Sequence, residues 1–125
     1  MKVDRIYLIA GLLWLIGGML LGEHMGRSQD HGQMPTHAHI MLVGGVLSVL
    51  WGIINRVWSI GSGLLAWIQL GLHQAGTAVI IYALFHLYGG NPTDQFGMMA
   101  GIGAMIVIVA TVLMLVLAFL AKPAD

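Results

Sequence analysis

The protein has 125 residues, of which 58% are hydrophobic and 8% are charged, and its formal net charge is zero. Together with a mean hydropathy of +0.89, this composition is typical of a single-domain integral membrane protein and offers no basic surface for nucleic acid. The sequence contains no cysteine, which excludes disulfides, thiolate-bound zinc, iron–sulfur clusters and covalently attached c-type heme.

Four apolar runs, at residues 6–22, 38–55, 62–88 and 95–121, leave all the charged residues outside them. A helix needs roughly 20 apolar residues to cross a bilayer, and lipid requires every backbone hydrogen bond to be satisfied internally. We therefore predict an all-α fold, a four-helix transmembrane bundle formed by a single domain over residues 1–125.

The first run follows Lys2 and Arg5, as the apolar part of a signal peptide would. No small-residue cleavage site with a polar sequence behind it follows this run. Gly18 and Gly22 lie four residues apart and suit close helix packing. We expect this run to be a helix of the mature protein.

The distribution of basic residues predicts how the chain is oriented in the membrane. Lys2, Arg5, Arg56 and Lys122 fall on one side of the predicted helices, and Arg27 falls on the other. Basic residues favour the cytoplasmic side. We therefore predict that both termini are cytoplasmic in a multi-pass protein of the bacterial inner membrane.

This orientation gathers most histidines near the predicted outer face. Five of the six lie there: His24, His31, His37, His39 and His86. His73 lies roughly 20 Å deeper than His86, at 1.5 Å per helical residue. For His73, the sequence leaves open an axial ligand to heme iron, a proton-relay group, and a neutral imidazole bonded to a neighbouring helix.

Helical phase divides these residues further, at about 100° per residue. One stripe is small and polar, as a side facing the bundle or a cofactor would be: His37, Met41, Gly44, Ser48, Gly52 and Asn55. In the third run, Gln69, His73, Gly76, Thr77 and Ile80 share a stripe. His39 should point nearly opposite to His37, so one regular helix would not direct both at the same ion. Tyr82 and His86 form an i, i+4 pair on another side.

A second possible site uses the residues of the outer loop and the start of the second helix. Its candidate metal ligands are His24, His31, Met34 and Met41. Thioether with imidazole suits copper(I), whereas zinc would prefer histidine with Asp30 or Glu23. The alternative is that these methionines only pack and these histidines are only solvated.

Two stretches of sequence resemble a known family. "THAHIMLVGGVLSVLWGIINR", residues 36–56, resembles helix 2 of heme–copper oxidase subunit I, where a histidine at the outer mouth ligates low-spin heme. "MGRSQDH" (25–31) and "HAH" (37–39) resemble short four-helix bacterial proteins described as cytochrome c oxidase subunit I-like. The resemblance implies a b-type heme, with or without a second metal, held by His37 or His39 together with His73 or His86.

Three hypotheses follow. The first is a small b-type heme protein in electron transfer or diatomic-gas handling, with a respiratory-chain redox partner; any enzymatic activity would be that of an oxidoreductase. The second is an outward-facing copper- or zinc-binding or transport protein. The third is an accessory subunit of a respiratory membrane complex. Because four helices enclose a macrocycle poorly, we also expect a homo-oligomer.

Overall fold

The computed structural model describes residues 2–60, 63–91 and 93–121. Within these ranges the chain is helical and contains no strand. One long helix is a composite of three consecutive segments. The elements are α1 (Val3–Ser28), α2 (Met34–His39), the π-helical segment η1 (Ile40–Val46), α3 (Leu47–Val57), α4 (Leu64–Leu87) and α5 (Asp94–Leu120). The described chain thus has four continuous helices that are long and apolar enough to cross a membrane, as a multi-pass membrane protein requires.

The first two helices extend well beyond the apolar runs that predicted them. The predicted outer loop at 23–37 shrinks to residues 29–33, because α1 continues to Ser28 and α2 begins at Met34. The polar end of α1 carries an ion pair one turn apart, from Arg27 Nε to Glu23 Oε1 at 3.1 Å. An apolar run indicates which residues contact lipid. A helix can be longer than its apolar run, because its backbone hydrogen bonds continue past the lipid boundary.

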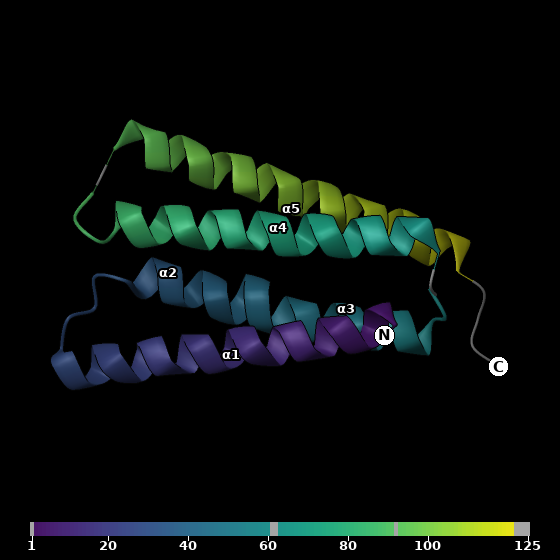
Figure 1. Ribbon diagram of the computed structural model, residues 1–125, viewed down its shortest axis with the longest axis horizontal. Helices are drawn as coiled ribbons and strands as arrows, with labels where there is room; N and C mark the ends of the chain where they lie inside the picture. Colours follow the sequence, from purple (N-terminus) through teal and green to yellow (C-terminus); the bar gives the residue numbers. More distant parts are fainter. Residues whose placement is uncertain (1, 61–62, 92, 122–125) are drawn as a thin grey trace.

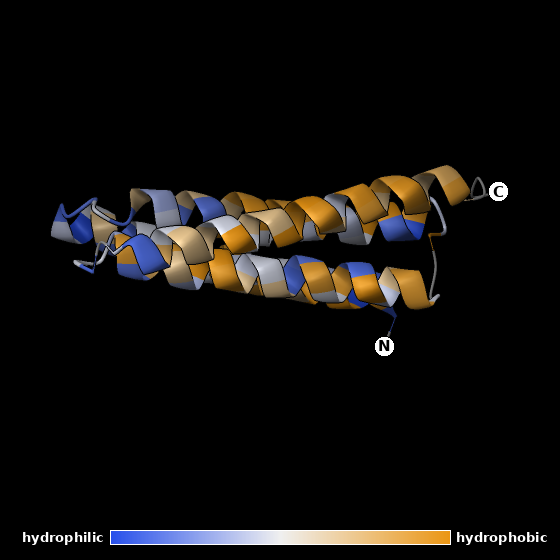
Figure 2. Ribbon diagram, turned by 90° about the horizontal axis from the view of Figure 1, so that it is seen from above, coloured by the Kyte–Doolittle hydropathy of each residue, from blue (hydrophilic) through white to orange (hydrophobic). Residues whose placement is uncertain are grey.

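The four long helices form two antiparallel hairpins (Figure 1). The first pairs α1 with the composite helix α2–η1–α3, and the second pairs α4 with α5; packing is most extensive within each hairpin. The N-terminal end of α1 and the C-terminal end of α5 lie at the same end of the bundle (Figure 1). The hydrophilic residues gather most clearly at the opposite end, where α1 turns into α2 (Figure 2).

Glycines allow the helices of each hairpin to approach closely. A Cβ atom at Gly22 would lie 2.8 Å from His37 Cε1, and one at Gly18 would overlap Met41 Sδ. The close-packing face predicted for the first helix is therefore confirmed, and it is used inside the chain. In the second hairpin, a Cβ at Gly76 or at Gly103 would lie 3.0 Å from the carbonyl oxygen of the other glycine.

The bundle is apolar outside and partly polar inside, as expected of helices surrounded by lipid. Leu13, Leu20 and Phe119 are 64%, 65% and 82% exposed on the outer surface. The interior instead holds most of the two predicted stripes. Buried members are Gly44, Ser48, Gly52 and Asn55 of the composite helix, and Gln69, His73, Gly76, Thr77 and Ile80 of α4. The predicted bundle-facing stripe is therefore confirmed from Gly44 to Asn55, whereas His37 and Met41 are half-buried.

Candidate functional site

His73 lies at the centre of a polar layer between the two hairpins. Its side chain is completely buried. The indole N–H of Trp51 donates to His73 Nδ1 at 3.3 Å, and His73 Nε2 lies 3.0 Å from the carbonyl oxygen of Val43. An indole N–H can only donate and a carbonyl can only accept, so Nδ1 must be the acceptor and Nε2 must carry the proton. Both ring nitrogens of this neutral imidazole are therefore occupied by protein partners.

The π-helical segment explains why the Val43 carbonyl is available to His73. In an α-helix, the backbone N–H of Leu47 would donate to the oxygen of Val43, four residues earlier. Here it donates instead to Leu42, five residues earlier. His73 takes the place of the missing helical donor, which satisfies a carbonyl that would otherwise be orphaned in the membrane interior.

Tyr7 and Gln69 extend this layer across the bundle. The hydroxyl of Tyr7 donates to Gln69 Oε1, and Gln69 Nε2 donates to the carbonyl oxygen of Ala110 at 3.2 Å. The Tyr7 ring also meets His73 edge-on, with centroids 5.9 Å apart. These contacts connect α1 and α4 to α5.

A second polar chain runs beside the first. The indole N–H of Trp14 donates to Gln74 Oε1, and Gln74 Nε2 donates to Ser48 Oγ, each at 2.9 Å. This chain joins α1, α4 and α3. Unpaired polar groups are costly in hydrocarbon, so these two chains of hydrogen bonds hold the hairpins together. Apolar contacts alone would do so less well, because an apolar side chain gains little by exchanging lipid for protein.

Two buried polar atoms have no hydrogen-bond partner within the described residues. They are Thr77 Oγ1 and Asn55 Oδ1. Thr77 lies one helical turn from His73 on α4, whereas Asn55 lies near the end of α3. Both ring nitrogens of His73 therefore have hydrogen-bond partners, whereas these two side-chain oxygen atoms do not.

His37 and His39 are arranged differently from His73. Nδ1 of His37 lies 2.9 Å from the carbonyl oxygen of Gly18, and Nδ1 of His39 lies 2.7 Å from that of Pro35. Since a carbonyl only accepts, each Nδ1 must carry the proton. Neither Nε2 has a hydrogen-bond partner among the described residues, so in the neutral ring its lone pair has no protein donor. This is the tautomer and second-sphere bond typical of a histidine that ligates a metal through Nε2.

The two rings are fixed by bonds to different elements. His37 bonds across to α1, whereas His39 bonds back to the preceding turn of its own helix. Across residues 2–60, 63–91 and 93–121, no three His, Asp or Glu side chains lie close enough to hold one metal ion.

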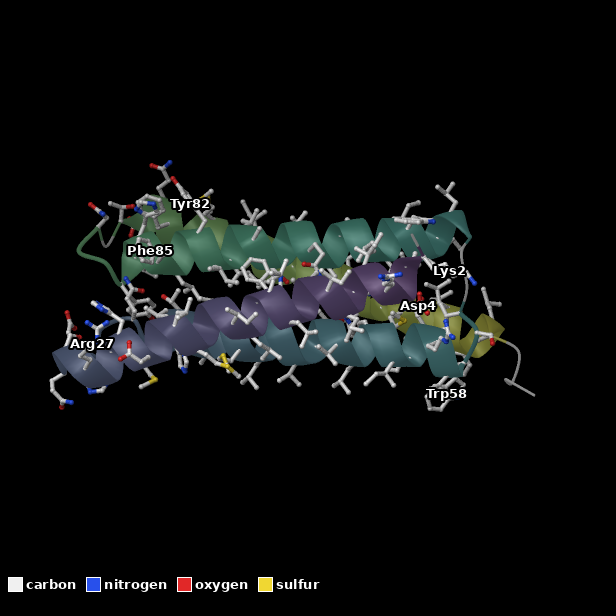
Figure 3. All side chains as sticks on the ribbon, turned by 60° about the horizontal axis from the view of Figure 1, so that its bottom comes forward. Lys2, Asp4, Arg27, Trp58, Tyr82 and Phe85 are labelled. Atoms are coloured by element: carbon white, nitrogen blue, oxygen red, sulfur yellow. The ribbon has the colours of Figure 1, made fainter. Side chains whose placement is uncertain are left out.

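His86 lies in an aromatic cluster at the same end of the molecule. Its ring stacks on Phe96 with centroids 4.9 Å apart and an angle of 11° between the planes, and it meets Tyr82 edge-on at 4.6 Å. The predicted i, i+4 pair of Tyr82 and His86 is thus confirmed. Tyr82 and Phe85 lie at the end of the bundle that carries Arg27, opposite Lys2 and Trp58 (Figure 3).

The remaining predicted ligands are dispersed. His24 and His31 are exposed, and Met34 is 47% exposed. Met41 is half-buried, with its sulfur against Gly18. Met41 thus has an evident packing role, while the two exposed histidines have surroundings typical of solvated residues.

Sequence reasoning missed part of the polar layer. Tyr7, Trp14 and Gln74 were not singled out, although each is a hydrogen-bonding side chain within an apolar run. Such residues are rare enough in membrane helices that their presence was a usable signal. Their partners are 26 to 62 residues away in the chain, so the sequence alone could not pair them.

Comparisons with protein-family models, with curated proteins and with solved structures find no match to this chain. The resemblance to heme–copper oxidase subunit I therefore stays a prediction based on the two stretches quoted above.

Proposed function

We propose that this protein is a small integral-membrane b-type heme protein in which His37 or His39 is an axial ligand through Nε2. Its role would be electron transfer with a respiratory-chain partner, or the handling of a diatomic gas. In the proposed orientation both termini are cytoplasmic and the heme lies in the outer half of the membrane. The observation that carries the proposal is the pair of Nδ1–H bonds to backbone carbonyls, which leave two imidazole lone pairs without a protein partner.

The donor chemistry suits heme iron, which takes imidazole nitrogen as an axial ligand. The bonds to Gly18 and Pro35 would hold the rings in a fixed tautomer and increase their basicity. When bound, the heme would supply a one-electron iron couple; the chain would supply the ligand, its orientation and an apolar surrounding.

His73 has a different role in this proposal. Both of its nitrogens already bond to Trp51 and to the Val43 carbonyl, so ligation would break one of these bonds deep in the bundle. We assign His73 to holding α3, η1 and α4 together.

His86 lies at the same end of the molecule as His37 and His39, so we consider it as the second axial ligand.

We propose that one copy of the chain does not enclose the heme macrocycle by itself. Three grooves on the bundle are lined, within the described residues, by side chains other than histidine. In this proposal a macrocycle on His37 or His39 lies against the outer surface of the bundle. A second copy of the chain, completing a homo-oligomer, would cover it.

The test is an optical spectrum of the purified protein, oxidised and then reduced, with metal analysis of the same sample. The proposal expects a Soret band with b-type visible bands on reduction. These bands should be lost in His37→Ala or His39→Ala and kept in His73→Ala that has folded.

Three results would contradict the proposal. A colourless sample containing copper or zinc, from cells shown to supply heme, would favour the metal-handling alternative. A colourless, metal-free sample from such cells would favour the accessory-subunit alternative. A heme spectrum that disappears only in His73→Ala would move the ligand to the bundle interior.

A further inference from the structure

A groove opens between α1 and α3 at the end of the bundle opposite the outer histidines. Its volume is about 710 Å³. The floor is apolar, formed by Leu8, Ile53 and Val57 beside Gly52, and these three apolar side chains are 44%, 50% and 47% exposed. The backbones approach closely here, since a Cβ at Gly52 would lie 3.0 Å from the carbonyl oxygen of Asp4.

The rim of this groove is cationic. Lys2, Arg5 and Arg56 line it together with a single carboxylate, Asp4. Asp4 Oδ2 lies 3.3 Å from an Arg56 guanidinium nitrogen, and its side chain is only 17% exposed, against 76% for Arg56. Asp4 therefore offsets one cation and holds it over the groove, and the rim keeps a surplus of positive charge.

The depth of the groove in a membrane follows from its neighbours. The cations lie at the ends of the two helices, where the apolar runs stop. Trp58, one residue beyond α3, is 52% exposed and lies at the same end as Lys2 and Asp4 (Figure 3). Exposed tryptophan at a helix end marks the membrane–water interface. The cationic rim is thus placed at headgroup level and the apolar floor at acyl-chain level.

We propose that this groove binds an anionic phospholipid, with its phosphate at Lys2, Arg5 and Arg56 and one acyl chain along Leu8, Ile53 and Val57. A basic rim attracts an anionic headgroup, whereas a zwitterionic headgroup gains little from surplus positive charge. The combination of charged rim and exposed apolar floor favours a lipid over a free phosphate ion, which would not use the floor.

The test uses the full-length protein purified in mild detergent. Equal amounts of phosphatidylglycerol and phosphatidylcholine with identical acyl chains are added, and native mass spectrometry measures the ratio of the two lipids retained. Wild type should favour phosphatidylglycerol. Arg5→Gln and Arg56→Gln should each lower this preference about fivefold. The matched control is Arg27→Gln, an exposed cation at the other end, which should leave the preference unchanged.

Two further variants separate the parts of the groove. Asp4→Asn removes the offsetting carboxylate and should keep or increase the preference. Ile53→Trp fills the floor at a half-exposed position and should reduce retention of both lipids. Equal retention of the two lipids by wild type, or an equal loss in Arg27→Gln, would overturn the site. Unchanged retention in Ile53→Trp would overturn the placement of the acyl chain.

Discussion

The histidines at the α2 mouth and the histidine in the bundle interior use their ring nitrogens in opposite ways. His37 and His39 each give one nitrogen to a backbone carbonyl and keep the other free of protein partners within the described chain. His73 gives both nitrogens to the protein, one to Trp51 and one to Val43. A buried position by itself therefore does not identify a ligand, because a ligand also needs a lone pair that no protein group occupies.

The difference has a structural origin. His73 faces the π-helical segment, where the Val43 carbonyl has lost its helical donor, so an imidazole N–H there satisfies the backbone. His37 faces Gly18 and Gly22, which expose backbone and leave room for a ring. His73 thus supplies a hydrogen-bond donor that the backbone lacks, whereas backbone carbonyl groups orient the rings of His37 and His39.

The largest effect on stability should come from His73→Ala. The change removes two hydrogen bonds, orphans the Val43 carbonyl and leaves a cavity beside Tyr7, at a cost of about 3 kcal/mol in the free energy of unfolding. Unfolding in mixed detergent micelles, followed by circular dichroism, measures it. His24→Ala, at an exposed position, is the control. Equal stability of the two variants would contradict a role for His73 in holding the helices together.

Gly22→Ala tests whether the orientation of His37 matters. The added Cβ would lie 2.8 Å from His37 Cε1, so the ring must move and its bond to Gly18 should be lost. If His37 is the heme ligand, heme affinity should fall about tenfold or more, as measured by titration of the apoprotein. Gly26→Ala is the matched control, because a Cβ there meets nothing within 4 Å. Unchanged affinity in Gly22→Ala would favour His39 as the ligand.

Trp51→Phe should have a smaller effect on stability. It keeps an aromatic ring against His73 but removes the indole donor, at a cost of about 1 kcal/mol. In a double-mutant cycle with His73→Ala, the coupling energy should be about 1 kcal/mol as well. Strictly additive effects would show that this hydrogen bond contributes nothing.

The smallest effects are expected at His24 and His31. Both are exposed, so alanine at either position should change the free energy of unfolding by less than about 0.5 kcal/mol. Neither variant should change the optical spectrum. A loss of bound copper in His31→Ala or Met34→Ala, measured by metal analysis, would instead support the outer metal site.

Much of the architecture was predictable because lipid imposes simple rules. The four apolar runs identified the four long helices, and helical phase grouped residues that prove to be buried, such as Ser48, Gly52 and Asn55 on α3 and Gln69, His73 and Thr77 on α4. The helix ends were less predictable. Residues 23–28 and 34–37 are helical although they lie outside the apolar runs, because backbone hydrogen bonding, and in 23–28 an ion pair, extends the helices past the lipid boundary.

By itself, the sequence determined that the described chain forms membrane-length helices, because runs of apolar residues and helical periodicity are local properties. Only the tertiary structure decided which histidine nitrogens are occupied. That depends on a π-helical register shift that frees the Val43 carbonyl and on glycines that bring α1 against His37. The π-helical shift is local, but the partners of His37 and His73 lie on other helices, 19 to 30 residues away in the chain, and only folding brings them together. His39 is the exception, since it bonds to Pro35 in the preceding turn of its own helix.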